Sequence, residues 1–192
     1  MHTTGNESAT ARLRDEHVLI LRVADILERL VERSEAAQET DFSAFEDCVT
    51  FVRLFADGCH HGKEEDLLFP ALEARGMPRH GGPIAVMLED HRRGREYAGR
   101  MQDALEPARA GSGEALRQLL DGARDYIALI RNHILKEDHV LFQMADQMVS
   151  GPACQALCGN YDDVCARRFE GHSKEQLEEL AGDLERRVPA LG

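Results

Sequence analysis

The sequence predicts an all-α fold, an up-down four-helix bundle with two additional C-terminal helices. The chain of 192 residues is 30% charged and only 5% aromatic, a composition typical of long helices. Apolar residues recur at intervals of three and four along four long stretches, as the buried face of a helix requires. The segment CHHGKEEDLLF at residues 59–69 also has a second copy, NHILKEDHVLF, at residues 132–142. The chain therefore reads as two helical hairpins in tandem.

The first hairpin is predicted from helices over residues 10–37 and 43–75. Ser43 and Glu46 resemble a capping box at the start of the second helix. Pro70 lies inside that helix and should kink or interrupt it just after the repeated motif.

The second hairpin is predicted from helices over residues 84–109 and 114–149. Beyond it we expect a shorter helix over residues 153–169. A last helix should open with a capping box formed by Ser173 and Gln176.

Three parts of the chain are expected from this pattern. Residues 1–9, which include His2, should form a flexible N-terminal tail. Residues 10–149 should form the bundle, and residues 150–192 an extension packed on it. At this length the bundle can bury a full core as one domain.

Each copy of the repeat contains a histidine and a glutamate four residues apart, so both side chains lie on one helix face. A further histidine precedes each pair by 43 and 42 residues. Packed about a pseudo-two-fold axis, the two hairpins would bring together His17, His60, Glu64, His91, His133 and Glu137. Imidazole and carboxylate groups suit iron, manganese or zinc, and two bridging carboxylates suit a pair of ions.

Periodicity leaves two registers open in the second helix, His60 with Glu64 or His61 with Glu65. Alignment with the second copy, where Asn132 precedes the histidine, favours the first. In that second copy Glu137 lies in an apolar stripe, where an uncompensated carboxylate is costly and needs a cation or a proton.

Three further residues are candidates for an additional ligand or for an outer hydrogen-bonding partner. They are His61, Asp138 and His172. Asp138 is offset by one position from the inward stripe. His172 lies at the start of the last helix, where a surface cap is the simpler interpretation.

The chain has five cysteines, an odd number that does not indicate a disulfide framework in a chain without a secretory signal. Cys154, Cys158 and Cys165 follow one apolar stripe at helical spacing and are interpreted as core thiols. Cys59, beside a candidate ligand, receives no role.

A formal charge of −12 without a basic cluster does not favour binding to nucleic acid. No apolar run approaches the roughly 18 residues of a membrane-spanning helix. The N-terminal residues also lack the apolar segment of a signal peptide. We therefore expect a soluble, cytoplasmic protein.

Over residues 10–149 the chain resembles the hemerythrin-like (HHE cation-binding) family. The resemblance rests on the lone histidine of the first helix, HHGKEEDLLFP, the EDH of the third helix, and KEDHVLF. It implies that the six residues of the repeat bind a non-haem di-iron centre with an oxo or hydroxo bridge, in which Glu64 and Glu137 are the bridging carboxylates. Manganese and zinc are less favoured than iron.

The chain departs from the oxygen-carrying hemerythrins one turn after His91, where Arg95 replaces their second histidine. Its four-histidine, two-glutamate set is similar instead to hemerythrin-like proteins tied to peroxide, nitric oxide and iron–sulfur repair. We expect a di-iron protein that binds or reacts with peroxide, oxygen or nitric oxide in stress defence, with peroxidase-like or catalase-like turnover as one form. The alternative is a non-catalytic oxygen or iron sensor, or an iron-binding or iron-donor module.

Overall fold

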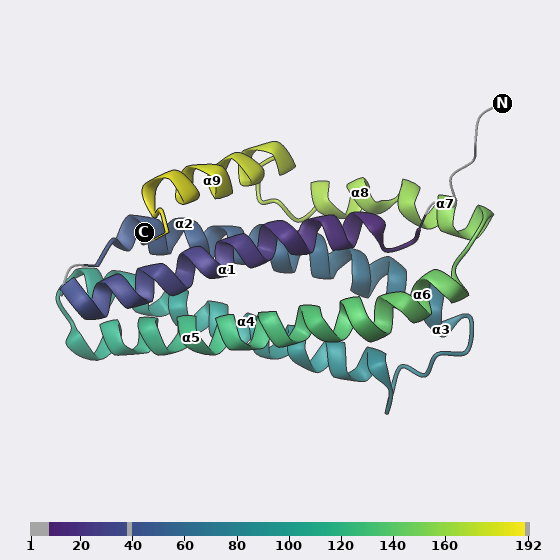
Figure 1. Ribbon diagram of the computed structural model, residues 1–192, viewed down its shortest axis with the longest axis horizontal. Helices are drawn as coiled ribbons and strands as arrows, with labels where there is room; N and C mark the ends of the chain where they lie inside the picture. Colours follow the sequence, from purple (N-terminus) through teal and green to yellow (C-terminus); the bar gives the residue numbers. More distant parts are fainter. Residues whose placement is uncertain (1–7, 38–39, 191–192) are drawn as a thin grey trace.

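The computed structural model describes residues 8–37 and 40–190, which include no β-strand. The helices of residues 11–148 form four columns, and the columns pack into an elongated up-down bundle (Figure 1). The first column is α1 (Ala11–Ala37) and the third is α4 (Pro83–Arg109). The second runs through α2 (Phe42–Phe51), η1 (Val52–His61), η2 (Glu64–Leu68) and α3 (Phe69–Glu73). The fourth runs through α5 (Gly113–Lys136), η3 (Glu137–Leu141) and α6 (Phe142–Met148). The predicted all-α bundle is confirmed.

The second and fourth columns contain π-helical segments, η1, η2 and η3, which the sequence pattern does not predict. In the last two, the N–H groups of Phe69 and Phe142 bond to the carbonyls of Glu64 and Glu137, five residues back. These positions are equivalent in the two copies of the repeat, and only the first copy has a proline beyond them. Because the second copy forms the same π-turn without a proline, Pro70 is not its cause. Pro70 lies in the first turn of α3, and the helical column continues through it.

The helix caps agree only in part with the sequence-based expectation. The carboxylate of Asp41, rather than Ser43, caps α2 by accepting from the N–H of Ala44. The capping box of Ser173 and Gln176 is present at the start of α9 (Lys174–Arg187).

A polar layer divides the apolar core of the bundle into two clusters. Each column crosses from one cluster to the other at a histidine or glutamate. In α1, for example, Leu13 belongs to one cluster and Ile20 to the other, with His17 between them. The candidate ligands therefore lie between two layers of buried hydrocarbon.

The C-terminal extension packs along one side of the bundle, where α9 lies against α1 and α2 (Figure 1). The single helix expected over residues 153–169 is two helices, α7 (Pro152–Gly159) and α8 (Tyr161–Ala166), which meet at Asn160.

The assignment of Cys165 as a core thiol is wrong, because it forms a disulfide with Cys59. This bond joins α8 to η1 across 106 residues of sequence. The odd number of cysteines could not reveal this disulfide, because the pairing depends on how the C-terminal extension packs on the bundle.

The start of the described chain is packed, so the predicted tail is too long at its C-terminal end. Ala9 is fully buried, and its carbonyl accepts a hydrogen bond from Tyr161 at 2.7 Å. Ser8 donates to Asp146 at 2.8 Å. His2, also assigned to that tail, falls outside the described residues. Within the described part of the chain, no helix is both long and apolar enough to span a bilayer.

Candidate metal centre

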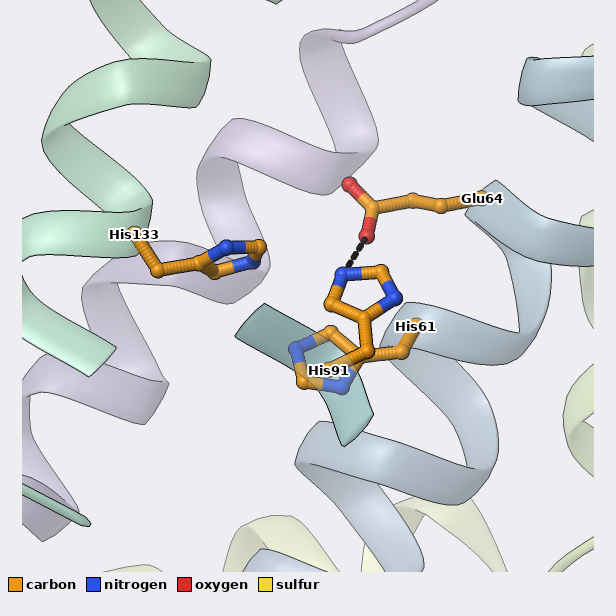
Figure 2. A group of neighbouring side chains, drawn as sticks. All are labelled: His61, Glu64, His91 and His133. Carbon is orange, nitrogen blue, oxygen red and sulfur yellow. Dashed lines mark ion pairs between the residues drawn. The ribbon is translucent and has the colours of Figure 1, made fainter. Parts of the chain in front are cut away.

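Seven buried side chains meet at the polar layer and form two groups that share one residue. In each group one potential ligand atom per residue lies within 4.8 Å of the others. The first group is His17, His60, Glu64 and Glu137, and the second is His61, Glu64, His91 and His133. Figure 2 shows the second group, with the carboxylate of Glu64 pointing toward the imidazole of His91. All six residues of the predicted set are brought together, with His61 in addition.

Both carboxylates lie between imidazoles of different hairpins. One oxygen of Glu137 is 3.1 Å from Nε2 of His17 and 3.2 Å from Nε2 of His133. The two oxygens of Glu64 are 3.7 Å from Nε2 of His60 and 3.3 Å from Nε2 of His91. Each glutamate therefore faces two histidines at once, which is the position of a carboxylate that bridges two ions.

The structure answers the question of register in an unexpected way, because His60 and His61 both point inward. Consecutive residues of an α-helix are about 100° apart, which normally puts them on different faces. Here both histidines end the π-helix η1, and the ring of His61 stacks on that of His91 with centroids 3.8 Å apart. Glu64 points to the centre, whereas Glu65 lies outside it against Nδ1 of His91.

Each of the five imidazoles has a carboxylate beside its Nδ1 atom. The pairs are His17–Asp138 at 3.0 Å, His60–Glu16 at 3.0 Å, His61–Asp57 at 3.3 Å, His91–Glu65 at 2.8 Å and His133–Asp90 at 3.5 Å. In the first four pairs Nδ1 is the nitrogen that donates, because a carboxylate can only accept; in the fifth, Nδ1 of His133 lies near Asp90 without a hydrogen bond. Each Nε2 is thereby directed toward the centre, the arrangement found behind metal-bound histidines.

The pseudo-two-fold symmetry of the repeat extends to these outer contacts. The acid before each lone histidine, Glu16 or Asp90, reaches the HxxxE histidine of its own hairpin. The acid after each bridging-type glutamate, Glu65 or Asp138, reaches the lone histidine of the other hairpin. A lysine at equivalent positions completes each half, because Lys63 donates to Glu16 and Lys136 to Asp90.

His61 breaks this symmetry. Its counterpart in the second copy is Ile134, and the counterpart of Asp57 is Ile130. Arg95, which stands where oxygen carriers have a histidine, donates to both Asp57 and Glu65. The missing imidazole is thus supplied from η1, and Arg95 instead holds the acids behind His61 and His91.

The donors fit a metal because several buried polar atoms at the centre have no hydrogen-bond partner among the described residues. They are Nε2 of His61, His91 and His133, both oxygens of Glu64, and Oε1 of Glu137. Buried polar groups are ordinarily satisfied, since each one left bare costs about 1–3 kcal/mol. A cluster of bare nitrogen and carboxylate acceptors pointing at one another is compensated by cations and not by further protein donors.

In the metal-free protein, burial and neighbouring charges shift the pKa values of Glu64 and Glu137 in opposite directions. Burial and the neighbouring charge of Glu137 raise the pKa of Glu64 well above its usual range. Burial also favours the neutral form of Glu137, but His133 and His17 outweigh this effect and hold the pKa of Glu137 well below its usual range. Burial acts in the opposite sense on His133 and would lower its pKa, yet Glu137 and Asp90 raise the pKa of His133 to about 9. In the protein alone, the negative charge of Glu137 is thus balanced by the histidines beside it.

The three candidates for an additional ligand, His61, Asp138 and His172, lie in different places. His61 joins the second group. Asp138 lies outside the centre, behind His17. His172 is exposed and belongs to neither group of the described residues, so the idea that it reaches the centre is wrong. Its backbone N–H bonds to the carbonyl of Phe169.

The outer positions of the acids Asp57 and Glu65, and the contacts of the cations Lys63 and Arg95 with the outer acids, were not predicted from the sequence. A signal for part of this set exists in the repeat itself, because both copies place a lysine directly before the inward glutamate and an acid directly after it.

The comparisons agree with this geometry. The chain is 25% identical over 179 residues to the uncharacterized proteins Rv1995 of Mycobacterium tuberculosis and Mb2018 of Mycobacterium bovis, covering 93% of this chain and 69% of each relative. No solved structure matches the chain. The family model of the hemerythrin HHE cation-binding domain matches residues 8–145, which contain all seven converging side chains. The chain therefore belongs to the hemerythrin HHE cation-binding family.

Proposed function

We propose that the chain is a non-haem di-iron protein that binds or reacts with a small oxidant in stress defence. Peroxide and dioxygen are the leading candidates, and nitric oxide is a further one. The observation that supports this best is the position of Glu64, which belongs to both groups of potential ligands. A shared carboxylate is what two adjacent ions require and one ion does not.

In this proposal the two groups hold one ion each. His17 and His60 bind the first ion, and His61, His91 and His133 bind the second. Glu64 and Glu137 bridge them, because each already faces imidazoles of both hairpins. The set contains nitrogen and carboxylate donors without a thiolate, which suits iron better than it suits a structural zinc site.

Two iron ions, when bound, supply the reversible one-electron steps that small oxidants require. The residues of the chain contribute position and protection. The outer acids hold each imidazole in one orientation and increase its basicity. The seven residues of the centre are at most 4% exposed, because the apolar clusters on both sides exclude bulk water. Such burial favours oxidants with two non-hydrogen atoms over larger substrates.

The test is anaerobic reconstitution of the full chain with ferrous iron, followed by a metal count and by optical spectra before and after oxygen and peroxide. Two irons per chain with a near-ultraviolet charge-transfer band are expected. His133→Ala should lose at least one iron. The matched control is His139→Ala, since His139 is an exposed histidine on the same helical column. A count of zero or one that His133→Ala leaves unchanged contradicts the proposal.

The same preparation separates the forms of the function. Continuous loss of peroxide supports a catalase-like or peroxidase-like enzyme. A stable spectral adduct without turnover supports a sensor or carrier. Ready removal of iron by mild chelators supports an iron donor, although the five acid-backed imidazoles favour tight retention.

A further inference from the structure

A cavity of about 420 Å³ leads from the surface to one side of the candidate metal centre. Its outer wall includes the exposed residues Arg53, Arg95 and Glu170. Its inner wall includes five residues that are at most 5% exposed, Val52, Leu54, His61, Ala98 and Tyr126. Of the seven side chains that converge at the centre, His61 alone lines this cavity. The cavity and the centre therefore meet at one imidazole.

The ring of His61 lies between the cavity and the other ligand candidates. Its Nδ1 is 3.3 Å from a carboxylate oxygen of Asp57, which is itself part of the cavity wall. The ring also stacks on that of His91, with centroids 3.8 Å apart, and belongs to the second group of potential ligands (Figure 2). A single side chain thus touches both the cavity and the space in which an ion would lie.

Two other cavities approach the centre less closely, because each reaches an outer acid but none of the seven converging side chains. One includes Glu16, behind His60, and the other includes Asp90, near His133. At Glu16 the approach is also occupied by the ammonium groups of two lysines. The cavity beside His61 is therefore a more direct route than either of these.

The second copy of the repeat shows that an opening is not needed to build the centre. His61 corresponds there to Ile134, and its partner Asp57 corresponds to Ile130. Both isoleucines belong to the apolar core, and β-branched side chains have little rotational freedom in a helix. The equivalent side of the centre is closed by hydrocarbon, whereas on this side an imidazole borders empty volume into which its ring can turn.

The charges of the outer wall are paired with one another. Arg95 forms ion pairs with Asp57 and Glu65, and Arg53 lies 3.7 Å from Glu170. Further in, the wall is mainly apolar, and an unpaired ion is costly to bury there. Uncharged molecules meet no such cost. The cavity therefore favours peroxide, dioxygen and nitric oxide over small anions.

We propose that this cavity is the entrance through which small uncharged oxidants reach the centre, and that His61 is its gate, whose ring turns into the cavity to let them pass. The inference deepens the proposed function and rests on it, because an entrance matters only if the centre holds ions that meet such molecules. The ion bound by His61, His91 and His133 is then the one that an oxidant reaches first.

Gly99 allows the entrance to be narrowed without a change at the centre. It lines the cavity, and nothing lies within 4 Å of a β-carbon added there. Gly99→Leu should fold, because leucine is a much better helix former than glycine. The matched control is Gly113→Leu, since Gly113 also has open space at its β-carbon but lies at the start of α5, outside the cavity.

The first measurement is the binding of nitric oxide to the full chain loaded with ferrous iron, followed by stopped-flow spectroscopy. Gly99→Leu should slow both association and dissociation about tenfold, because a narrower entrance raises the barrier in both directions. The dissociation constant and the iron count should stay unchanged. Gly99→Ala should show a smaller slowing, and Gly113→Leu none.

The second measurement needs no metal. Diethyl pyrocarbonate is a small uncharged reagent that modifies imidazole nitrogens. In the metal-free full chain, His61 should be modified before the other four histidines of the centre, as located by fragmentation of the modified peptides. Gly99→Leu should slow this modification by a similar factor. The exposed His139 is the internal control and should react equally in both chains.

Two results would overturn the entrance. One is nitric oxide kinetics that Gly99→Leu leaves unchanged, or that it alters only through the dissociation constant. The other is modification of His17, His91 or His133 ahead of His61. A chain that binds no iron contradicts the di-iron proposal instead, and the order of modification in the metal-free chain still decides whether the cavity leads to His61. The two proposals can therefore fail separately.

Discussion

The buried ammonium group of Lys63 donates to Glu16, the same carboxylate that accepts from Nδ1 of His60. Lys63 is fully buried and Glu16 is 4% exposed. Burial opposes ionisation of Glu16, but His60 and Lys63 hold its pKa well below the usual range. A second cation, Lys174 from the C-terminal extension, lies 3.1 Å from the same carboxylate. The extension is thus connected to the centre through one acid.

Replacement of this lysine should therefore damage both stability and metal binding. Lys63→Met leaves Glu16 buried with one cation fewer, at an expected cost of about 3 kcal/mol in the free energy of unfolding. Iron affinity should fall about 10–100-fold, as for other losses behind a ligand. Urea unfolding and competition with a chelator measure the two effects. Lys136→Met is the symmetry-related control: Lys136 is 42% exposed, so its loss should cost under about 1 kcal/mol.

The two bridging-type glutamates should respond differently to the same chemical change in the metal-free chain. Glu64 has a raised pKa, so Glu64→Gln mimics its neutral form and should change stability by less than about 1 kcal/mol. Glu137 is ionised against His133 and His17, so Glu137→Gln should cost about 1–3 kcal/mol. In the iron-loaded chain both variants should lose metal. Equal stability losses in the metal-free variants would contradict this difference in charge.

His61, which corresponds to an isoleucine in the second copy, should affect the binding of one ion more than that of the other. His61→Leu resembles the isoleucine of the second copy and removes a donor from the second group only. The iron count should fall from two toward one, and the remaining ion should still depend on His17. If His61→Leu keeps two tightly held irons, His61 is a neighbour of the centre and not a ligand.

The Cys59–Cys165 disulfide should stabilise the folded chain by restricting the unfolded one. For a loop of 106 residues the chain-entropy model predicts about 4–5 kcal/mol. Thermal unfolding should therefore shift to lower temperature in a reducing buffer, and Cys165→Ser should show the same lower value in either buffer. Peptide mapping without reduction should recover the two cysteines in one cross-linked fragment. A melting temperature that is insensitive to the reductant would argue against the bond in solution.

Much of this molecule could be predicted from the repeat, and the failures have physical causes. The two His-x-x-x-Glu pairs and the lone histidines locate the polar layer, because helical spacing and hairpin order are local properties. His61 is only an additional candidate under α-helical angles, which put it on a different face from His60, whereas η1 is π-helical and directs both inward. The disulfide and the contact of Lys174 with Glu16 depend on how the extension docks, which periodicity does not encode.

The acids behind the histidines illustrate the same limit. Glu16 is adjacent to His17 in sequence, yet it serves His60, and Asp138 serves His17 from the other hairpin. Sequence proximity gives the kind of residue that lies behind an imidazole but not which imidazole it serves. That assignment requires the packed bundle.

Because of the π-helical segments, a change in chain length can affect the metal centre without affecting the fold. A π-turn contains one residue more than the α-turn that could replace it. Deleting a single residue within η1 would let the column become α-helical while both ends of the bundle keep their apolar partners. In the resulting α-helix, His60 and His61 would lie about 100° apart around the axis and could not both point to the centre. Length variation of one residue at this place is therefore a route by which a descendant of this chain could keep its architecture and abandon its metal.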